Sequence, residues 1–303
     1  MIIRDLTNYL SETFSERVLF DEPMKKHTSF RTGGPAACFV TVDTEEELIG
    51  LLQKCTAFGQ TYFVMGNGSN VLVGDKGYDG LIIHLGTGFD VISVDETVIR
   101  AGAGALLSRL AAEAMRCGLM GLEFASGIPG SLGGAIFMNA GAYDGEMKQV
   151  VTRVRAVDPK GEVRELTGEE MAFGYRTSLF KQKPYVASLI TMELDRGDRD
   201  TIRKTMDELA ARRREKQPLE YPSAGSTFKR PEGHFAGKLI QDAGLRGFSV
   251  GGAQVSEKHC GFVINKGNAT SRDVVDVIES VQKRVKEQFG VALEPEVIML
   301  GEF

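Results

Sequence analysis

The sequence predicts an α+β fold from two kinds of pattern that alternate irregularly along its 303 residues. Four segments repeat apolar residues at intervals of three and four, which is typical of amphipathic helices. Short runs of β-branched and aromatic residues bounded by glycines predict strands. After Gly80 several of these runs follow one another with no helical segment between them, which argues against a doubly wound fold of repeated βαβ units.

Each expected helix has one apolar stripe, and the four helices span residues 44–58, 105–117, 199–214 and 271–289. Thr44 and Glu47 give the first helix the spacing of a capping box, and Gly59 is its stop signal. The stripes expected on the first, third and fourth helices are Leu48, Leu51, Leu52 and Cys55, then Ile202, Met206, Leu209 and Arg213, and finally Val274, Ile278, Val281, Val285 and Phe289. These helices form the framework of the predicted fold.

The expected strands lie between the helices and are short. They span residues 37–42, 62–65, 81–85, 91–94, 153–157 and 186–194. The polar stretch 195–200 separates the last of them from the arginine-rich third helix. Because domain boundaries fall in exposed polar linkers, we expect a second domain to begin there.

The composition is that of a globular protein, with 42% hydrophobic and 25% charged residues. A net charge of −5 provides no basic field for nucleic acid, so we expect a small ligand and no nucleic-acid partner. The four cysteines lack a CxxC pair or metal-ligand spacing, and the N-terminus lacks the apolar core of a signal peptide. We therefore expect reduced thiols, mostly buried, in a cytoplasmic protein without a bound metal.

Residues 124–143 contain no charged side chain and include a GxxxG spacing at Gly130 and Gly134. A membrane span must satisfy every backbone polar group within itself. Five glycines and a proline in this segment would interrupt a helix too often for that. We therefore expect no membrane span.

Two glycine-rich segments are the strongest ligand signals. The first, Gly66-Asn67-Gly68-Ser69-Asn70, is a tight turn whose backbone N–H groups can bind phosphate oxygens, although by itself it is compatible with an ordinary turn. It lacks the GxGxxG spacing of a Rossmann site, and no helix is expected directly after it. The second, residues 126–135, has four glycines in eight positions, which indicates close backbone approach to a ligand or to another part of the chain. Together they favour a dinucleotide.

The pair GNGSN and SGIPGSLGGA resembles the FAD-binding domain of the vanillyl-alcohol oxidase type flavoproteins. With further motifs it resembles the UDP-N-acetylenolpyruvoylglucosamine reductase family of bacterial peptidoglycan synthesis. These motifs cover most of the chain in the family's order: HTSFRTGGPA at 27–36, MNAGAYDGEM at 138–147, YRTSLF at 175–180, YPSAGSTFKRP at 221–231, AGKLIQDAGLRG at 236–247 and LEPEV at 293–297. The combination is far more specific than any one motif.

The resemblance implies a FAD-binding domain in two parts at residues 1–197 and a smaller α+β substrate-binding domain at 198–303, whose C-terminal segment returns to the active site. It implies FAD and NADPH as cofactors and a UDP-sugar as substrate. The residues implied to bind the cofactor are Gly66, Asn67, Gly68, Ser69, Asn70, Ser126, Gly127, Ile128, Pro129, Gly130, Ser131, Gly133, Gly134, Asn139 and Ala140.

Reduction of an enolpyruvyl ether places a hydride on the β-carbon and leaves carbanion character at the α-carbon, next to the carboxylate. The resemblance implies that Arg176 holds this carboxylate, that Ser226 donates the proton, and that Glu296 acts with Arg176, in a role that would require a raised pKa. Without the resemblance, Ser226 would be an ordinary turn residue and Glu296 a solvated carboxylate.

The implied substrate contacts are Lys216, Lys229 and His259. Some family members have glutamine at the position of His259 and asparagine at that of Arg230, so the polar contacts to the substrate differ within the family. The chain also has little room for a tyrosine-bearing insertion after residue 180, so it resembles the shorter type. Two other hypotheses are an FAD-dependent oxidase of the same fold, acting on an alcohol or sugar, and a nucleotide-binding regulatory module without catalysis.

Overall fold

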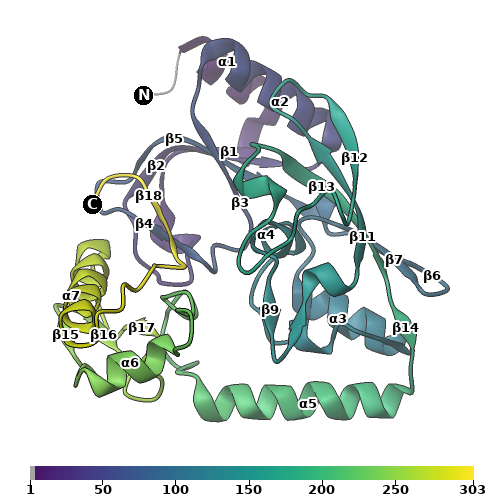
Figure 1. Ribbon diagram of the computed structural model, residues 1–303. Coiled ribbons are helices and arrows are strands. Elements are labelled where there is room, and N and C mark those ends of the chain that lie inside the picture. Colours follow the sequence, from purple (N-terminus) through teal and green to yellow (C-terminus); the bar gives the residue numbers. More distant parts are fainter. Residues whose placement is uncertain (1–3) are drawn as a thin grey trace. The chain divides into compact units, whose positions relative to one another are not determined.

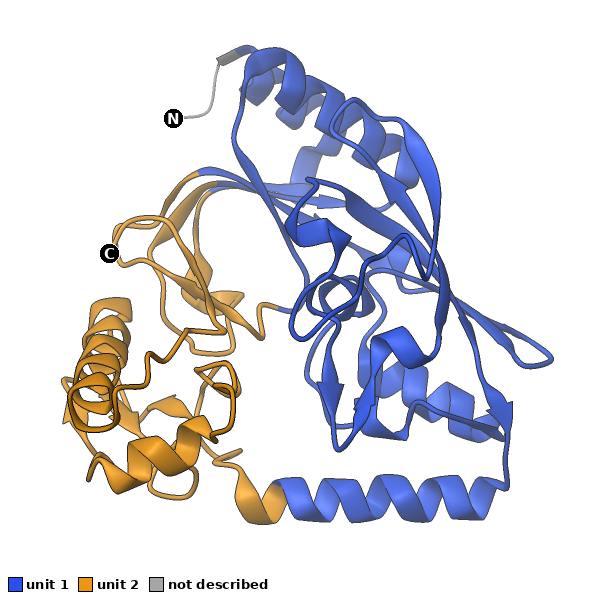
Figure 2. Ribbon diagram, in the orientation of Figure 1, with its two compact units in different colours: residues 1–20, 38–67, 80–213 blue, residues 21–37, 68–79, 214–303 orange. Residues whose placement is uncertain are grey.

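The computed structural model describes residues 4–303, which form two compact units (Figure 2). Each unit combines three segments of the sequence. The first contains the chain up to Phe20, Cys38–Asn67 and Gly80–Arg213; the second contains Asp21–Ala37, Gly68–Asp79 and Arg214–Phe303. The expected division into a flavin-binding and a substrate-binding domain at residue 197 stays a prediction.

The first unit contains a five-stranded sheet of order β12-β11-β13-β7-β6, in which every neighbouring pair is antiparallel. Its strands are β6 (Ile92–Asp95), β7 (Val98–Gly102), β11 (Val151–Val157), β12 (Val163–Thr167) and β13 (Val186–Glu193). The sequence predicted β6, β11 and β13 to within two residues of their bounds. The antiparallel pairing confirms the α+β class.

A four-stranded sheet has the order β1-β2-β5-β3. Its strands are β1 (Val18–Pro23), β2 (Pro35–Val42), β3 (Tyr62–Met65) and β5 (Tyr78–Leu85), and the chain passes between the two units within β1, β2 and β5. Strand β3 runs parallel to β5, which is possible because the chain makes a long connection between them. The first glycine segment begins directly after β3.

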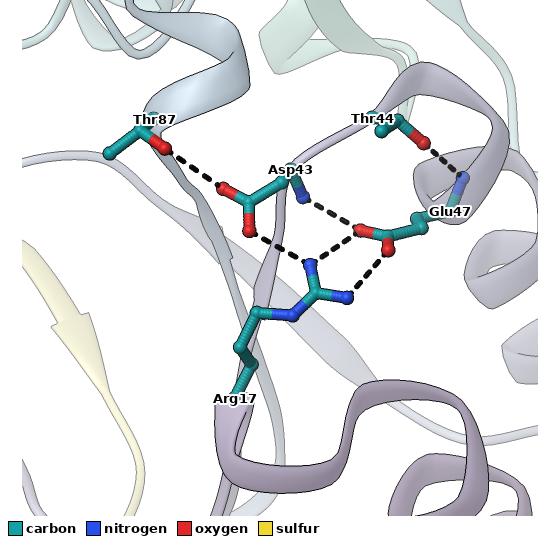
Figure 3. A network of polar contacts seen from close by, with 5 residues as sticks. All are labelled: Arg17, Asp43, Thr44, Glu47 and Thr87. Carbon is teal, nitrogen blue, oxygen red and sulfur yellow. Dashed lines mark hydrogen bonds and ion pairs between the residues drawn. The ribbon is translucent and has the colours of Figure 1, made fainter.

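Helix α2 (Glu45–Phe58) follows β2 and buries the predicted stripe of leucines and Cys55. Thr44 accepts a hydrogen bond from the Glu47 N–H, and Gly59 ends the helix in the left-handed conformation with φ 61°. The Glu47 carboxylate accepts the Asp43 N–H at 2.8 Å and two hydrogen bonds from Arg17 (Figure 3). The cap therefore belongs to a wider ion-pair network that fixes the start of α2.

The remaining helices of the first unit are α1 (Arg4–Phe14), α3 (Leu107–Arg116), α4 (Leu132–Met138) and most of α5 (Arg199–Lys216) (Figure 1). Helix α4 packs against β13. The sequence did not predict α1 or α4, and α4 begins inside the second glycine segment because Ser131 accepts a hydrogen bond from the Gly134 N–H. Two short antiparallel pairs complete this unit: β8 (Leu119–Met120) with β14 (Asp195–Arg196), and β9 (Gly141–Ala142) with β10 (Gly145–Glu146).

The second unit has its own apolar core. Helix α7 (Ser271–Phe289) packs against the antiparallel strands β15 (Ser249–Val250), β16 (Ala253–Val255) and β17 (Val263–Asn265), and α6 (Ala236–Asp242) packs against α7. Strand β4 (Val71–Val73) pairs in parallel with β18 (Ile298–Leu300). Helix α7 has the predicted bounds, but Phe289, expected on its apolar stripe, is 37% exposed because the helix ends there at Gly290.

Distant segments of sequence meet in this second unit. Ser271 donates its hydroxyl to the Val73 carbonyl at 2.5 Å, and its N–H bonds to the Asp75 carboxylate at 2.8 Å. Asn265 donates to the Phe30 carbonyl at 3.0 Å. The C-terminal helix and sheet are therefore anchored by residues from the first quarter of the chain.

The cysteines are free thiols, and Cys38, Cys55 and Cys260 are buried as expected, whereas Cys117 is half-buried. Burial raises the pKa of Cys38 and of Cys55 to about 12. No helix in the described part of the chain has both the length and the hydropathy to cross a membrane. Residues 4–303 also contain no group of three or more His, Cys, Asp or Glu side chains that could hold a metal ion.

Candidate functional site

The two glycine segments meet within the first unit, although about sixty residues separate them in sequence. The Asn67 side chain donates a hydrogen bond from Nδ2 to the Pro129 carbonyl at 2.7 Å. A Cβ atom on Gly66 would overlap the hydroxyl of Ser131, so a larger residue fits here only if that serine side chain moves. The structure thus joins residues 66–67 to residues 129–131 by a hydrogen bond and by direct contact.

Backbone donors are concentrated at this junction. Within the described part of the chain, the N–H groups of Asn67, Gly130 and Ser131 donate no hydrogen bond. Successive N–H groups on glycine-rich backbone form a concave anion-binding surface. The junction therefore has the donor set that the diphosphate of a dinucleotide requires, and the residues present fit FAD.

Asn139 ends α4 and is fully buried in a left-handed conformation with φ 44°. Its side chain donates to the Glu146 carboxylate and to the Gly174 carbonyl, each at 3.0 Å, and accepts the Lys148 N–H at 2.9 Å. Both carboxamide hydrogens are therefore used within the protein. The Asn139 N–H also has an internal partner, the Ile136 carbonyl at 3.3 Å, and the side chain ties the β9–β10 hairpin to the loop that carries Arg176.

Arg176 lies in a tight turn closed by reciprocal backbone hydrogen bonds between Gly174 and Thr177. Its φ of 54° is left-handed, a conformation that L-residues avoid and that is concentrated at functional sites. Nη2 donates to the Gly141 carbonyl at 3.1 Å, and the guanidinium lies 5.4 Å from the centre of the Tyr175 ring. The turn and the β9 strand together orient this guanidinium.

In the second unit, Ser226 lies next to the chain segment that carries Glu296. Thr227 accepts the Glu296 N–H at 2.8 Å, and the Lys229 N–H bonds to the Glu294 carbonyl at 2.9 Å. These bonds flank an antiparallel bridge between Phe228 and Pro295. The structure therefore brings together two predicted site residues that are seventy positions apart.

The first glycine segment reaches the same place through Asn70. Its side chain donates to the Glu296 carbonyl at 3.1 Å, and its own carbonyl accepts the Ile298 N–H at 3.0 Å. Asn70 thus holds the backbone on both sides of Val297. Part of the predicted cofactor segment is in this way attached to the segment, directly before β18, that carries a predicted catalytic carboxylate.

Thr227 is a fully buried positioning residue that the sequence analysis did not identify. Its hydroxyl accepts the Val263 N–H at 3.0 Å, and its N–H donates to the Gly261 carbonyl at 2.8 Å. Ser226 is exposed, whereas Thr227 and Phe228 are both buried, so the serine lies at the surface of a segment that its two neighbours hold in place. The sequence signal was the neighbouring pair of hydroxyl residues after Gly225.

The predicted substrate residues are in different environments. Lys229 forms an ion pair with Glu294, while Lys216 is exposed at the end of α5 and forms no side-chain hydrogen bond or ion pair within residues 4–303. His259 accepts the Gly261 N–H on Nδ1 at 3.1 Å. Burial lowers the pKa of His259, which favours its neutral form. Arg176 belongs to the first unit, whereas the three substrate residues, Ser226 and Glu296 belong to the second.

Comparison with known proteins first defines the class. A family model described as "FAD binding domain" matches residues 36–167, a range that contains both glycine segments. A second, described as "UDP-N-acetylenolpyruvoylglucosamine reductase, C-terminal domain", matches residues 217–300, which contain Ser226 and Glu296. The fold is therefore that of a flavoprotein with a FAD-binding part and a reductase-type C-terminal part.

The relatives then define the family. A UDP-N-acetylenolpyruvoylglucosamine reductase from Clostridium perfringens is 52% identical over 293 residues, which cover 96% of each chain. One from Caldanaerobacter subterraneus is 51% identical over 98% of each. The crystal structure of the Thermus caldophilus enzyme has a TM-score of 0.80 at 36% identity and covers 93% of this chain and 98% of its own. The chain belongs to the UDP-N-acetylenolpyruvoylglucosamine reductase family.

Proposed function

We propose that this chain reduces UDP-N-acetylenolpyruvoylglucosamine to UDP-N-acetylmuramate with NADPH, using FAD, in peptidoglycan synthesis. The observation that carries the proposal is the identity of about half of all residues with reductases of the same length. The joined glycine segments and the pairing of the Ser226 and Glu296 segments support it, because they bring together residues to which the resemblance assigns a shared role.

FAD, when bound, supplies the hydride transfer between NADPH and the enolpyruvyl group. We assign its binding to the two glycine segments, with further contacts at Asn139 and Ala140. The free N–H groups at Asn67, Gly130 and Ser131 hydrogen-bond the diphosphate. In this proposal the domain of residues 1–197 binds the flavin, and the domain of residues 198–303 binds the substrate.

Arg176 binds the substrate carboxylate. A guanidinium pairs with a carboxylate through two parallel hydrogen bonds, and this pairing strengthens as negative charge grows on the substrate. The turn between Gly174 and Thr177 fixes the guanidinium beforehand, so no reorganisation is needed when that charge develops. Glu296 acts with Arg176 at the same carboxylate.

Ser226 donates the proton to the α-carbon. A general acid must lie within hydrogen-bond reach of the atom that it protonates. The proposal is supported by the exposure of the Ser226 hydroxyl on a segment that Thr227 holds in place. Lys216 and Lys229 bind the diphosphate of the substrate or of NADPH, and His259 contacts the substrate as a neutral hydrogen-bonding group. We place the enzyme in the cytoplasm, where NADPH and nucleotide sugars are available.

The oxidase hypothesis is disfavoured by the family assignment, since the relatives are reductases over their whole length. A regulatory module without catalysis is disfavoured by the presence of Arg176, Ser226 and Glu296 together.

Spectroscopy of the purified protein tests the proposal. We expect a flavin absorption spectrum that NADPH bleaches within seconds and that the enolpyruvyl UDP-sugar restores without oxygen. A protein that takes up no flavin, or a reduced flavin that only oxygen reoxidises, would contradict the proposed function.

A further inference from the structure

Arg213 lies on α5 between two other arginines, and it differs from both. Arg212 and Arg214 are exposed, whereas Arg213 is half-buried on the stripe that also contains Ile202 and Met206. An arginine usually keeps its charged end in water even when its methylene groups are covered. Burial at this position therefore needs a reason other than packing alone.

Arg213 packs directly on the second glycine segment. A Cβ atom on Gly127 would lie 3.2 Å from Arg213 Cδ and 3.3 Å from Nη1, so the glycine leaves the space that the arginine fills. Both residues belong to the first unit. The guanidinium is consequently held beside the segment that Asn67 joins through the Pro129 carbonyl.

The charge of Arg213 has no counterion within residues 4–303, where it forms neither a hydrogen bond nor an ion pair. Arg17 and Arg155, by contrast, each make several hydrogen bonds to carboxylates. Burial lowers the pKa of Arg213, and the Tyr143 hydroxyl opposes this shift electrostatically. A partly buried cation without an anion destabilises the protein that contains it. An anionic ligand would remove this penalty.

We infer that Arg213 is the cation that binds the diphosphate of FAD at the second glycine segment. The inference rests on the proposed function. A guanidinium can donate two parallel hydrogen bonds to phosphate oxygens, and the N–H groups of Gly130 and Ser131 add backbone donors of the same polarity. UDP-sugars and NADPH also contain a diphosphate. FAD is the favoured ligand because Gly127 lies within the range matched by the FAD-binding family model.

The test compares FAD with a flavin that lacks both the diphosphate and the adenosine. Apoprotein, freed of flavin, is titrated with FAD and with riboflavin, which has the same ring system and no phosphate, and binding is followed by flavin fluorescence. Arg213→Met keeps the packing on Gly127 and removes the charge. Arg212→Met removes the same charge from the neighbouring exposed position and is the matched control.

We expect Arg213→Met to lower the affinity for FAD about ten- to hundredfold, because one or two charge-assisted hydrogen bonds are lost. Riboflavin affinity should stay within about twofold, and Arg212→Met should change neither ligand. The Arg213→Met apoprotein should unfold at the same or a higher urea concentration than wild type, because a partly buried unpaired charge is gone. Arg213→Lys should recover only part of the FAD affinity, since it cannot pair bidentately.

Three outcomes would overturn the inference. Equal weakening of FAD and riboflavin would make Arg213 a structural residue. If Arg213→Met leaves FAD affinity unchanged, Arg213 does not contact the FAD diphosphate. If that variant also binds UDP-N-acetylglucosamine or NADP⁺ more weakly, the arginine binds the diphosphate of that ligand instead. If wild-type apoprotein binds no FAD at all, the proposed function itself fails, and the inference fails with it.

Discussion

The contact between Gly66 and Ser131 predicts a specific pair of compensating substitutions. Gly66→Ala places a methyl group where the Ser131 hydroxyl lies. The serine can rotate away, but it then loses the hydrogen bond from the Gly134 N–H at 3.3 Å that caps α4, at a cost of about 1 kcal/mol. If it does not rotate, the two segments must separate, and overpacking costs about 1–3 kcal/mol. We therefore expect Gly66→Ala to reduce the free energy of unfolding by about 1–3 kcal/mol.

Ser131→Ala should alone cost about 1 kcal/mol through the lost cap. In the double variant the overlapping hydroxyl is absent, so Gly66→Ala should add little to the cost of Ser131→Ala. The coupling energy should equal almost the whole loss caused by Gly66→Ala. Urea unfolding of the four apoproteins measures it.

Gly134→Ala is the control, because a Cβ there would lie at an ordinary 3.4 Å from Ser131 Oγ and within a helix. It should leave stability unchanged or raise it by up to about 1 kcal/mol. If the losses from Gly66→Ala and Ser131→Ala simply add in the double variant, the two segments are not in the contact that explains glycine at position 66.

Three further predictions concern the chemistry, the junction and the start of α2. Ser226→Ala should keep FAD and its bleaching by NADPH but lower turnover of the enolpyruvyl substrate at least about a hundredfold; near-normal turnover would remove Ser226 as the proton donor. Asn67→Ala removes the hydrogen bond to the Pro129 carbonyl. It should lower the free energy of unfolding in urea by about 1 kcal/mol and the affinity for FAD about three- to tenfold. An unchanged FAD affinity would show that the junction does not orient the site. Arg17 lowers the pKa of Glu47, so the pair stabilises the fold above the unfolded-state pKa near 4.3 and loses this effect as pH falls through the lower folded-state value. Glu47→Gln should therefore lower the free energy of unfolding by about 0.5–1 kcal/mol at pH 7 and by progressively less towards pH 3. A difference from wild type in urea unfolding that does not change with pH would contradict this.

Local signals predicted the regular helices well. Thr270 and Gly290, one at each end of α7, cap a stripe of buried valines, and the bounds were predicted to the residue. Helix α4 was missed because its two glycines lower helix propensity, and it forms through the Ser131 cap and packing against β13. Strand β18 was missed because it is a three-residue strand without alternation, and its partner β4 is more than two hundred residues away.

Sequence patterns found both glycine segments but could not show how they meet. The Asn67–Pro129 hydrogen bond and the Gly66–Ser131 contact depend on where β3 and α4 lie in space. Ser226 and Glu296 could be named only through the family resemblance, because a serine in a turn and a glutamate near the C-terminus have no local signature. The segments of these two residues are joined by the bridge between Phe228 and Pro295, and no local sequence pattern predicts that bridge.

The anchoring of the C-terminal half by early residues has a consequence for biosynthesis. The Asn265–Phe30 and Ser271–Val73 hydrogen bonds span 235 and 198 positions. During translation, residues 21–37 and 68–79 leave the ribosome long before the helix and sheet that complete their unit exist. Contacts of such separation slow folding, because the entropy of closing a long loop is lost before the contacts form. The second unit therefore assembles after synthesis of almost the whole chain, and its early segments are exposed to chaperones and proteases until then.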